Sequence, residues 1–171
     1  MKRILILGNC GAGKSTLARQ LHETLQLPVI HLDQHYWQAG WIESEKEVWE
    51  KRVQVLMEQE EWIMDGNYSG SLAYRLLFAD TIILLNYNSY LCVFRVLKRY
   101  FLYKGRARPD MTANCPERLD WVFLRYVKNF RHNILPRTLE KLEHLKPHQH
   151  LLIFNTPKDT NSFLQSLQVV Y

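Results

Sequence analysis

The sequence lacks the features that mark membrane, secreted and zinc-binding proteins. No apolar run in its 171 residues approaches the roughly 20 residues that a membrane-spanning helix needs. Only four apolar residues follow Met1-Lys2-Arg3, too few for a signal peptide. The three cysteines (Cys10, Cys92, Cys115) form no disulfide framework, and none of the seven histidines is spaced with them as metal ligands would be. We therefore expect a cytoplasmic protein without a membrane partner.

The chain also has no internal repeat, no low-complexity linker and no Asn-Lys-x-Asp motif. Asp65-Gly66 lacks the Asp-x-x-Gly form, so a GTPase is disfavoured. The length and the 47% hydrophobic content suit one domain with a real core, and we predict a single domain over residues 1–171.

Short apolar runs alternate with helical patterns along the whole chain. Strands are expected at residues 2–7, 29–32, 62–64, 81–85 and 150–154. Helices are expected at residues 13–26, from near 44, 71–79, 89–103, 119–142 and 162–167. Strands that are apolar on both faces and alternate with helices are typical of a parallel sheet covered on both sides. The predicted fold class is therefore α/β, a three-layer sandwich with a five-stranded parallel sheet.

A glycine-rich stretch, residues 8–15, joins the first predicted strand to the first predicted helix. It reads G-x-x-x-x-G-K-S, whose backbone N–H groups point at one centre and bind phosphate at a helix N-terminus. A chance glycine-rich turn is disfavoured, because the preceding strand, the spacing, the Lys and Ser residues and the following helix all match this motif. Lys14 is expected on the β- and γ-phosphates and Ser15 on Mg²⁺, which predicts ATP with Mg²⁺. The expected nucleotide-binding residues here are Gly8, Gly11, Ala12, Gly13, Lys14, Ser15 and Thr16.

Two aspartates follow the second and third predicted strands. Because the carboxyl ends of parallel strands meet at one edge of the sheet, Asp33 and Asp65 are expected near Gly8. Asp65 is the candidate for ordering the waters of Mg²⁺. Asp33 is expected to bind the hydroxyl of a phosphate acceptor or Mg²⁺. The structural alternatives are that Asp65 starts a turn with Gly66 and that Asp33 caps the next segment.

Basic residues concentrate in one quarter of the chain. Residues 95–137 hold eleven of the 22 Lys and Arg, opposed only by Asp110, Glu117 and Asp120. Such a block needs an anionic partner or a solvated face. Arg95 and Arg99, four apart on one helix face, suit the gripping of phosphate oxygens. A phosphate-backbone footprint on DNA is the alternative, and we expect any such binding to be weak and non-specific.

Several stretches resemble bacterial DNA topology modulation proteins (FlaR-related), within the adenylate-kinase-like P-loop kinases. The matching stretches are residues 4–8, 28–33, 62–68, 95–99 and 105–110. The resemblance implies a nucleoside monophosphate kinase-like P-loop fold, a short basic lid at about residues 103–116 and an acceptor-binding segment at about 33–60. The family name implies an effect on DNA topology.

The kinase resemblance also implies roles for single residues. Arg95 is expected near the base, as are Asn155 and Pro157. Arg99 is expected on phosphate, and Arg106 and Arg108 over the γ-phosphate. With Lys14 and Asp33 these arginines form the predicted catalytic set.

An acceptor is expected beside Asp33. The expected acceptor-binding residues are Asp33, Tyr36, Asn67, Tyr68, Arg75 and Arg125. The sequence thus predicts a phosphotransferase that moves the γ-phosphate of ATP to a small anionic acceptor, a nucleoside monophosphate being the leading case. The alternative is a nucleotide-dependent regulatory or DNA-binding module.

Overall fold

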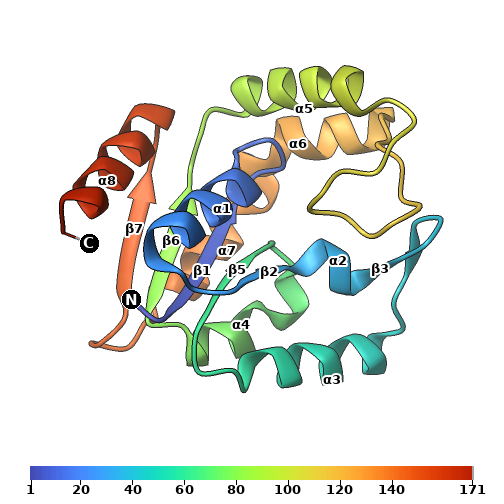
Figure 1. The fold of residues 1–171 in the computed structure, drawn as a ribbon. Coiled ribbons are helices and arrows are strands. Elements are labelled where there is room, and N and C mark those ends of the chain that lie inside the picture. The colour runs from blue at the N-terminus through green and yellow to red at the C-terminus, as the bar shows by residue number, and fades with distance from the viewer. Residues whose placement is uncertain (171) are drawn as a thin grey trace.

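A five-stranded parallel sheet forms the middle layer of the computed structural model, which describes residues 1–170 (Figure 1). Its strands are joined in the order β2-β5-β1-β6-β7. Their bounds are β1 (Arg3–Gly8), β2 (Val29–His31), β5 (Trp62–Asp65), β6 (Thr81–Leu85) and β7 (His150–Phe154). The predicted α/β three-layer fold with five parallel strands is confirmed.

The sheet register brings the ends of four strands, β1, β2, β5 and β6, to the same edge. Ile6 of β1 pairs with Asp65 of β5, and Gly8 pairs with Leu85 of β6. On the other side of β5, His31 pairs with Asp65. The strand that leads into the phosphate loop therefore lies at the centre of the sheet, next to the strand that ends in Asp65.

Eight helices within residues 1–170 cover the sheet. They are α1 (Lys14–Leu25), α2 (Leu32–Tyr36), α3 (Lys46–Met57), α4 (Ser69–Phe78), α5 (Ser89–Tyr103), α6 (Trp121–Asn133), α7 (Leu135–Leu142) and α8 (Pro157–Val170). Within this part of the chain, no helix is long and apolar enough to cross a membrane.

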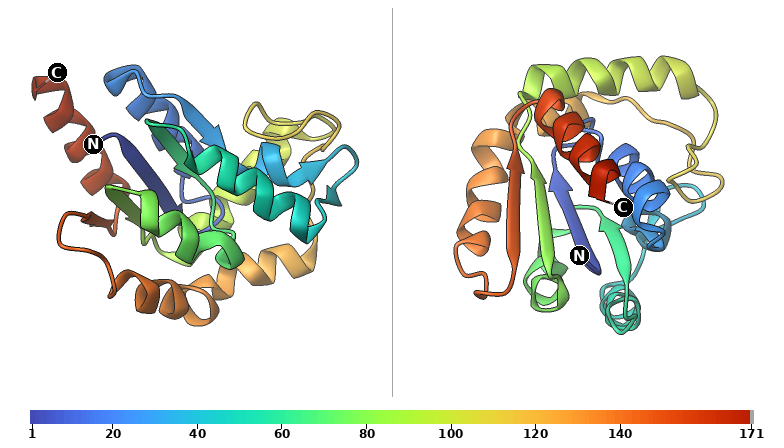
Figure 2. Two further views of the ribbon diagram at one scale, coloured as in Figure 1. Left: turned by 90° about the horizontal axis from the view of Figure 1, so that it is seen from below. Right: turned by 60° about the vertical axis from the view of Figure 1, so that its left-hand side comes forward.

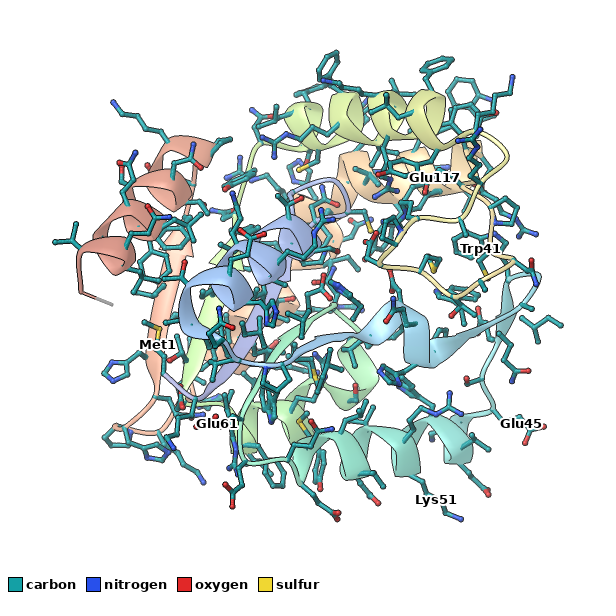
Figure 3. The ribbon with its side chains drawn as sticks, viewed as in Figure 1. Met1, Trp41, Glu45, Lys51, Glu61 and Glu117 are labelled. Carbon is teal, nitrogen blue, oxygen red and sulfur yellow. The ribbon has the colours of Figure 1, made fainter. Side chains whose placement is uncertain are left out.

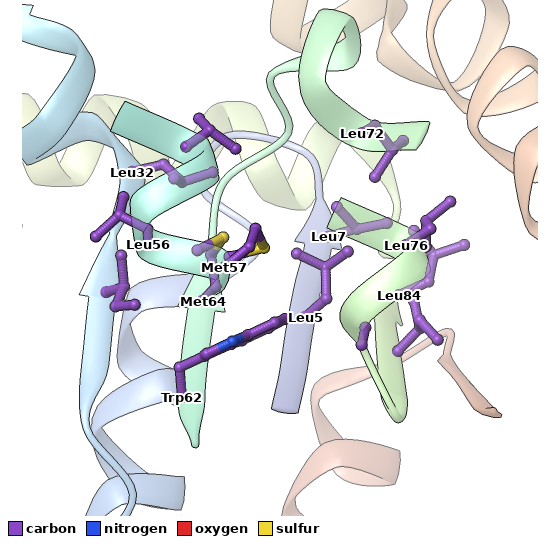
Figure 4. Packing of buried hydrophobic residues seen from close by; sticks show 14 of the residues in the cluster. Leu5, Leu7, Leu32, Leu56, Met57, Trp62, Met64, Leu72, Leu76 and Leu84 are labelled. Carbon is purple, nitrogen blue, oxygen red and sulfur yellow. The ribbon is translucent and has the colours of Figure 1, made fainter. Parts of the chain in front are cut away.

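Helices lie on both faces of the sheet (Figure 2). Alternating side chains of the strands form one core on each face. Leu5 and Leu7 point to the face covered by α3, α4 and α7, where Trp62 is also buried (Figure 4). Ile4 and Ile6 point to the face covered by α1, α5 and α8. Burial on both faces explains why these strands read as continuous apolar runs.

The apolar pattern of α5 does not show which of its faces is buried. The 3.6-residue period suggests a core stripe through Phe94 and Phe101, yet these side chains are 62% and 73% exposed. The buried side chains of α5 include Cys92 and Val96. The helix carries apolar residues on two faces, and periodicity alone does not tell which face is covered.

A small hairpin between α2 and α3 is also absent from the sequence-based assignment. Its strands, β3 (Trp37–Gln38) and β4 (Ile42–Glu43), have two residues each, too few to show a period. The helix expected from near residue 44 begins at Lys46. The Ser44 hydroxyl donates to the carbonyl of Tyr36 and does not cap this helix. The second strand ends at His31, which leaves Asp33 in the first turn of α2 rather than at the end of a strand.

Candidate active site

A cleft of about 1130 Å³ opens at the carboxyl edge of the sheet. Its floor is the phosphate loop, residues 10–16. Its walls come from the turn after β5, the α5 helix, the hairpin β3–β4 and the α5–α6 loop, residues 104–120. Trp41 of the hairpin and Glu117 of this loop both line the cleft, whereas Lys51 on α3 points away from the body of the molecule (Figure 3). The start of α8 completes the lining at Pro157.

The phosphate loop requires its glycines. Gly8, Gly11 and Gly13 have φ angles of +142°, +80° and +100°, which side-chain-bearing residues rarely adopt. A Cβ atom at Gly8 would lie 2.6 Å from the carbonyl oxygen of Leu85. One at Gly11 would lie 2.5 Å from that of Cys92. The loop can therefore curl tightly only with glycine at these positions.

Lys14 and Asn67 fix the strand end that enters the loop. The Lys14 Nζ donates to the carbonyls of Gly8 (2.9 Å) and Asn9 (3.0 Å). The Asn67 amide accepts from the N–H of Gly8 (3.1 Å) and donates to its carbonyl (2.9 Å). Asn67 was expected to bind the acceptor. It lies in the cleft wall, and its side-chain amide is hydrogen-bonded to the backbone of Gly8.

Three oxygen-bearing side chains of the cleft suit a magnesium ion. Ser15 and Asp65 were predicted, and Asp110 was not. Burial alone would raise the pKa of Asp110, but the charge of Arg108 and a hydrogen bond with Ser15 outweigh it and lower the pKa. Hydroxyl and carboxylate oxygens are ligands that Mg²⁺ prefers. No group of three or more His, Cys, Asp or Glu side chains within residues 1–170 is arranged to hold a metal. A bound Mg²⁺ would therefore complete its shell with water and phosphate oxygens.

Asp65 has a partner that the sequence did not suggest. The His31 Nδ1 lies 2.8 Å from the Asp65 Oδ1, and both side chains are largely buried. Burial lowers the pKa of His31, but the hydrogen bond and charge of Asp65 raise it by more. The pairing follows from the register of β2 with β5.

Asp33 lies in the cleft wall with its carboxylate against a phenol. The Tyr68 hydroxyl donates to its Oδ1 at 2.6 Å. Burial raises the pKa of Asp33, and the opposing effects of the Tyr68 hydrogen bond and the Arg108 charge do not cancel that rise. A carboxylate with a raised pKa is a stronger proton acceptor than an exposed one, which suits a general base.

Arginines from two elements line the cleft above the loop. The Arg95 Nη1 donates to the carbonyl of Ala12 at 3.1 Å. Arg99 from α5 and Arg108 from the α5–α6 loop both contact Glu117, a residue that the sequence analysis counted only as an opposing charge. Two guanidinium groups are thus held close together beside the phosphate loop.

Of the other predicted residues, five lie outside the cleft lining found within residues 1–170, and two belong to it. Arg106 and Arg125 are exposed. The Asn155 Oδ1 accepts from Asn86, and the Tyr36 hydroxyl donates to Glu43. Gly8 lies beneath the loop, and Thr16 and Pro157 do line the cleft.

Arg75 is fully buried under the turn that follows β5. Its guanidinium donates to the carbonyls of Gly66 (3.0 Å), Tyr68 (3.0 Å) and Asn67, and its Nε donates to the hydroxyl of Ser71 (3.2 Å). The sequence-based role of Arg75, gripping an acceptor, does not fit this enclosure. Arg75 instead holds the turn that carries Asn67 and Tyr68 into the cleft.

Arg75→Ala is expected to lower the free energy of unfolding by about 3 kcal/mol, because it leaves buried carbonyls without donors. Urea denaturation of the ligand-free protein measures this change. The matched control is Arg106→Ala, an exposed arginine whose loss should change stability by at most about 0.5 kcal/mol. Equal stability of the two variants would contradict the supporting role.

The hairpin β3–β4 and the α5–α6 loop are joined side by side. The Trp41 Nε1 donates to the carbonyl of Pro116 (2.9 Å), and the Thr112 hydroxyl donates to that of Trp37 (2.7 Å). The Arg118 guanidinium lies over the Trp41 ring, 5.4 Å from its centroid. These contacts join residues about 75 apart in the sequence, so no local pattern signals them.

Comparison with known proteins agrees with this fold. No protein-family model and no curated protein matches the chain. Solved structures match over nearly its whole length. The shikimate kinase of Acinetobacter baumannii, in complex with shikimate, has 19% identity over 99% of this chain and 93% of its own, with a TM-score of 0.59. A provisionally named kinase of Chloroflexus aurantiacus has 18% identity over 99% and 98%, with a TM-score of 0.55.

A gluconokinase of Sinorhizobium meliloti is similar as well, with 12% identity over 98% of this chain and 90% of its own and a TM-score of 0.50. At these identities the likeness concerns the fold alone, which this chain shares with those three kinases. The comparisons do not confirm the resemblance to DNA topology modulation proteins.

Proposed function

We propose that this protein is a small-molecule kinase that transfers the γ-phosphate of ATP, with Mg²⁺, to a small acceptor. The observation that carries the proposal is one cleft that joins a complete phosphate loop to Asp33, a carboxylate with a raised pKa. Phosphoryl transfer needs little covalent help from a protein, so positioning and charge stabilisation account for most of its catalysis. This cleft combines a phosphate cradle, arginines and a proton acceptor.

Each group then has a chemical task. Lys14 leaves the loop carbonyls to neutralise the β- and γ-phosphates, while Arg99 and Arg108 offset the charge of the transferred group. Ser15, Asp65 and Asp110 would hold Mg²⁺, directly or through its waters, and the ion would shield the charge of the phosphate oxygens. Asp33 takes the proton of the acceptor hydroxyl as its oxygen bonds to the γ-phosphorus and ADP leaves.

The acceptor belongs at the hairpin end of the cleft. Asp33, Trp37, Trp41 and Tyr68 line that end. The proposed acceptor is small and anionic, a nucleoside monophosphate being the leading case. Arg118, which lines the cleft over Trp41, is placed to meet its charge in the way that was expected of Arg75 and Arg125. The alternative of a DNA-binding module is not favoured, because four arginines of the basic block (Arg95, Arg99, Arg108, Arg118) line the cleft.

The decisive measurement is ADP release from Mg·ATP with a panel of acceptors: nucleoside monophosphates, nucleosides and hydroxy acids. We expect one class to raise release well above the acceptor-free background and EDTA to abolish it. Release that no acceptor raises, with ATP bound, would instead indicate a nucleotide-gated binding protein.

A further inference from the structure

Glu117 is an acidic side chain that the proposed chemistry does not use, although it lies in the cleft lining. Its side chain is only 3% exposed. One carboxylate oxygen, Oε1, accepts from Arg99 at both Nε (2.8 Å) and Nη2 (2.7 Å). The other, Oε2, lies 2.7 Å from the Arg108 Nε. One carboxylate therefore joins the two arginines, which come from different elements.

The backbone around Glu117 is fixed as well. Its N–H donates to the carbonyl of Arg106 at 3.0 Å, and it forms a bridge with Lys104 at the end of α5. Glu117 thus closes the base of the α5–α6 loop against the helix that carries Arg99. A buried carboxylate is costly to desolvate, and two guanidinium partners offset that cost.

The contacts of Glu117 favour a role in holding the two arginines over a role in competing with phosphate for them. A carboxylate that occupied the phosphate position would have to leave when the nucleotide binds, and Glu117 would then break contacts with both arginines. Asp110 is more exposed at 16%, and it pairs with Arg108 through the Nη1 atom. The Arg99 Nη1 has no hydrogen-bond partner within residues 1–170, so this edge of the guanidinium is free for phosphate.

We infer that Glu117 is a positioning residue that holds Arg99 and Arg108 together for the γ-phosphate of a bound triphosphate. The inference rests on the proposed function, and it adds the residue that gives the two arginines one fixed geometry. Glu117 does not touch the nucleotide. Because Glu117 already orders the two flexible cationic side chains, nucleotide binding does not have to bear the entropic cost of ordering them, which is the benefit of a preorganised site.

Glu117→Gln tests this inference, because a glutamine keeps the size but removes the negative charge that pairs with both arginines, and its NH₂ group cannot accept from a guanidinium. Calorimetry would measure the affinities for Mg·ADP and for the Mg²⁺ complex of the β,γ-imido analogue of ATP. We expect a loss of about tenfold or more for the analogue and little change for ADP. Glu117→Asp, which keeps the charge, should restore part of the loss. The matched control is Glu47→Gln, the same change at an exposed position of α3.

The other outcomes are distinct. Tighter binding of the analogue by Glu117→Gln would show that Glu117 competes with phosphate. Equal losses of affinity for both nucleotides would show that Glu117 has no specific role at the γ-phosphate. Unfolding of both Glu117 variants would assign Glu117 to stability alone. Each of these results overturns the inference and leaves the proposed function standing. Failure of the unaltered protein to bind either nucleotide would instead refute the proposed function.

Discussion

Lys14→Ala is expected to weaken ATP binding at least about 100-fold, or ~2.7 kcal/mol. The Lys14 ammonium is the cation of the phosphate loop itself, and its present partners are only the carbonyls of Gly8 and Asn9. Alanine is a good helix former at the first residue of α1, so the fold should persist. The loss therefore reports the removed charge.

Titration calorimetry with Mg·ATP measures this effect, and urea denaturation checks the fold. The matched control is Lys51→Ala, which removes an exposed ammonium of α3 away from the cleft (Figure 3). Unaltered affinity in the Lys14 variant would refute nucleotide binding by this loop.

Asp33→Asn is expected to slow phosphoryl transfer by about 100-fold or more while ATP affinity stays within about tenfold. Asparagine preserves the shape and can still accept from the Tyr68 hydroxyl, but it cannot take a proton. The rate of transfer to the best acceptor, followed by ADP release, is the measurement. The matched control is Glu50→Gln on the exposed face of α3.

The pKa of Asp33 adds a pH dependence to this prediction. Transfer needs the carboxylate form, so the rate should fall as the pH drops through the raised pKa. The same shift means that the folded state binds a proton more readily than the unfolded state, so ionised Asp33 costs stability above that pKa. Asp33→Asn should therefore be at least as stable as the unaltered protein at neutral pH. A pH-independent rate and unchanged transfer in the variant would contradict the general-base role.

The sequence predicted the centre of the molecule better than its periphery. Buried parallel strands produce apolar runs, and the phosphate loop has a fixed spacing, so the position of Lys14 and Asp65 at one sheet edge followed directly. The inner and outer faces of α5 could not be told apart, because exposed Phe94 and Phe101 repeat with the same period as a core stripe would.

The sequence predicted which helices, strands and turns contribute to the candidate site, but it did not predict which side chains contact one another there. An arginine in a sequence shows its charge, and only the fold shows what neutralises it: Arg75 is enclosed by carbonyls, whereas Arg99 meets Glu117 across 18 residues. Asp110 and Glu117 were visible only as opposing charges in a basic block. Their placement depends on how the α5–α6 loop folds back on α5 and the phosphate loop, which is a long-range property.

The hydrogen bonds between the hairpin β3–β4 and the α5–α6 loop affect how ligands can enter and leave the cleft. Trp41 and Thr112 link the wall beside Asp33 to the wall that carries Arg108. A movement that lifts one wall must either carry the other with it or break these hydrogen bonds. We therefore expect the two walls to move together, so that a ligand bound at either end of the cleft also restricts movement at the other end.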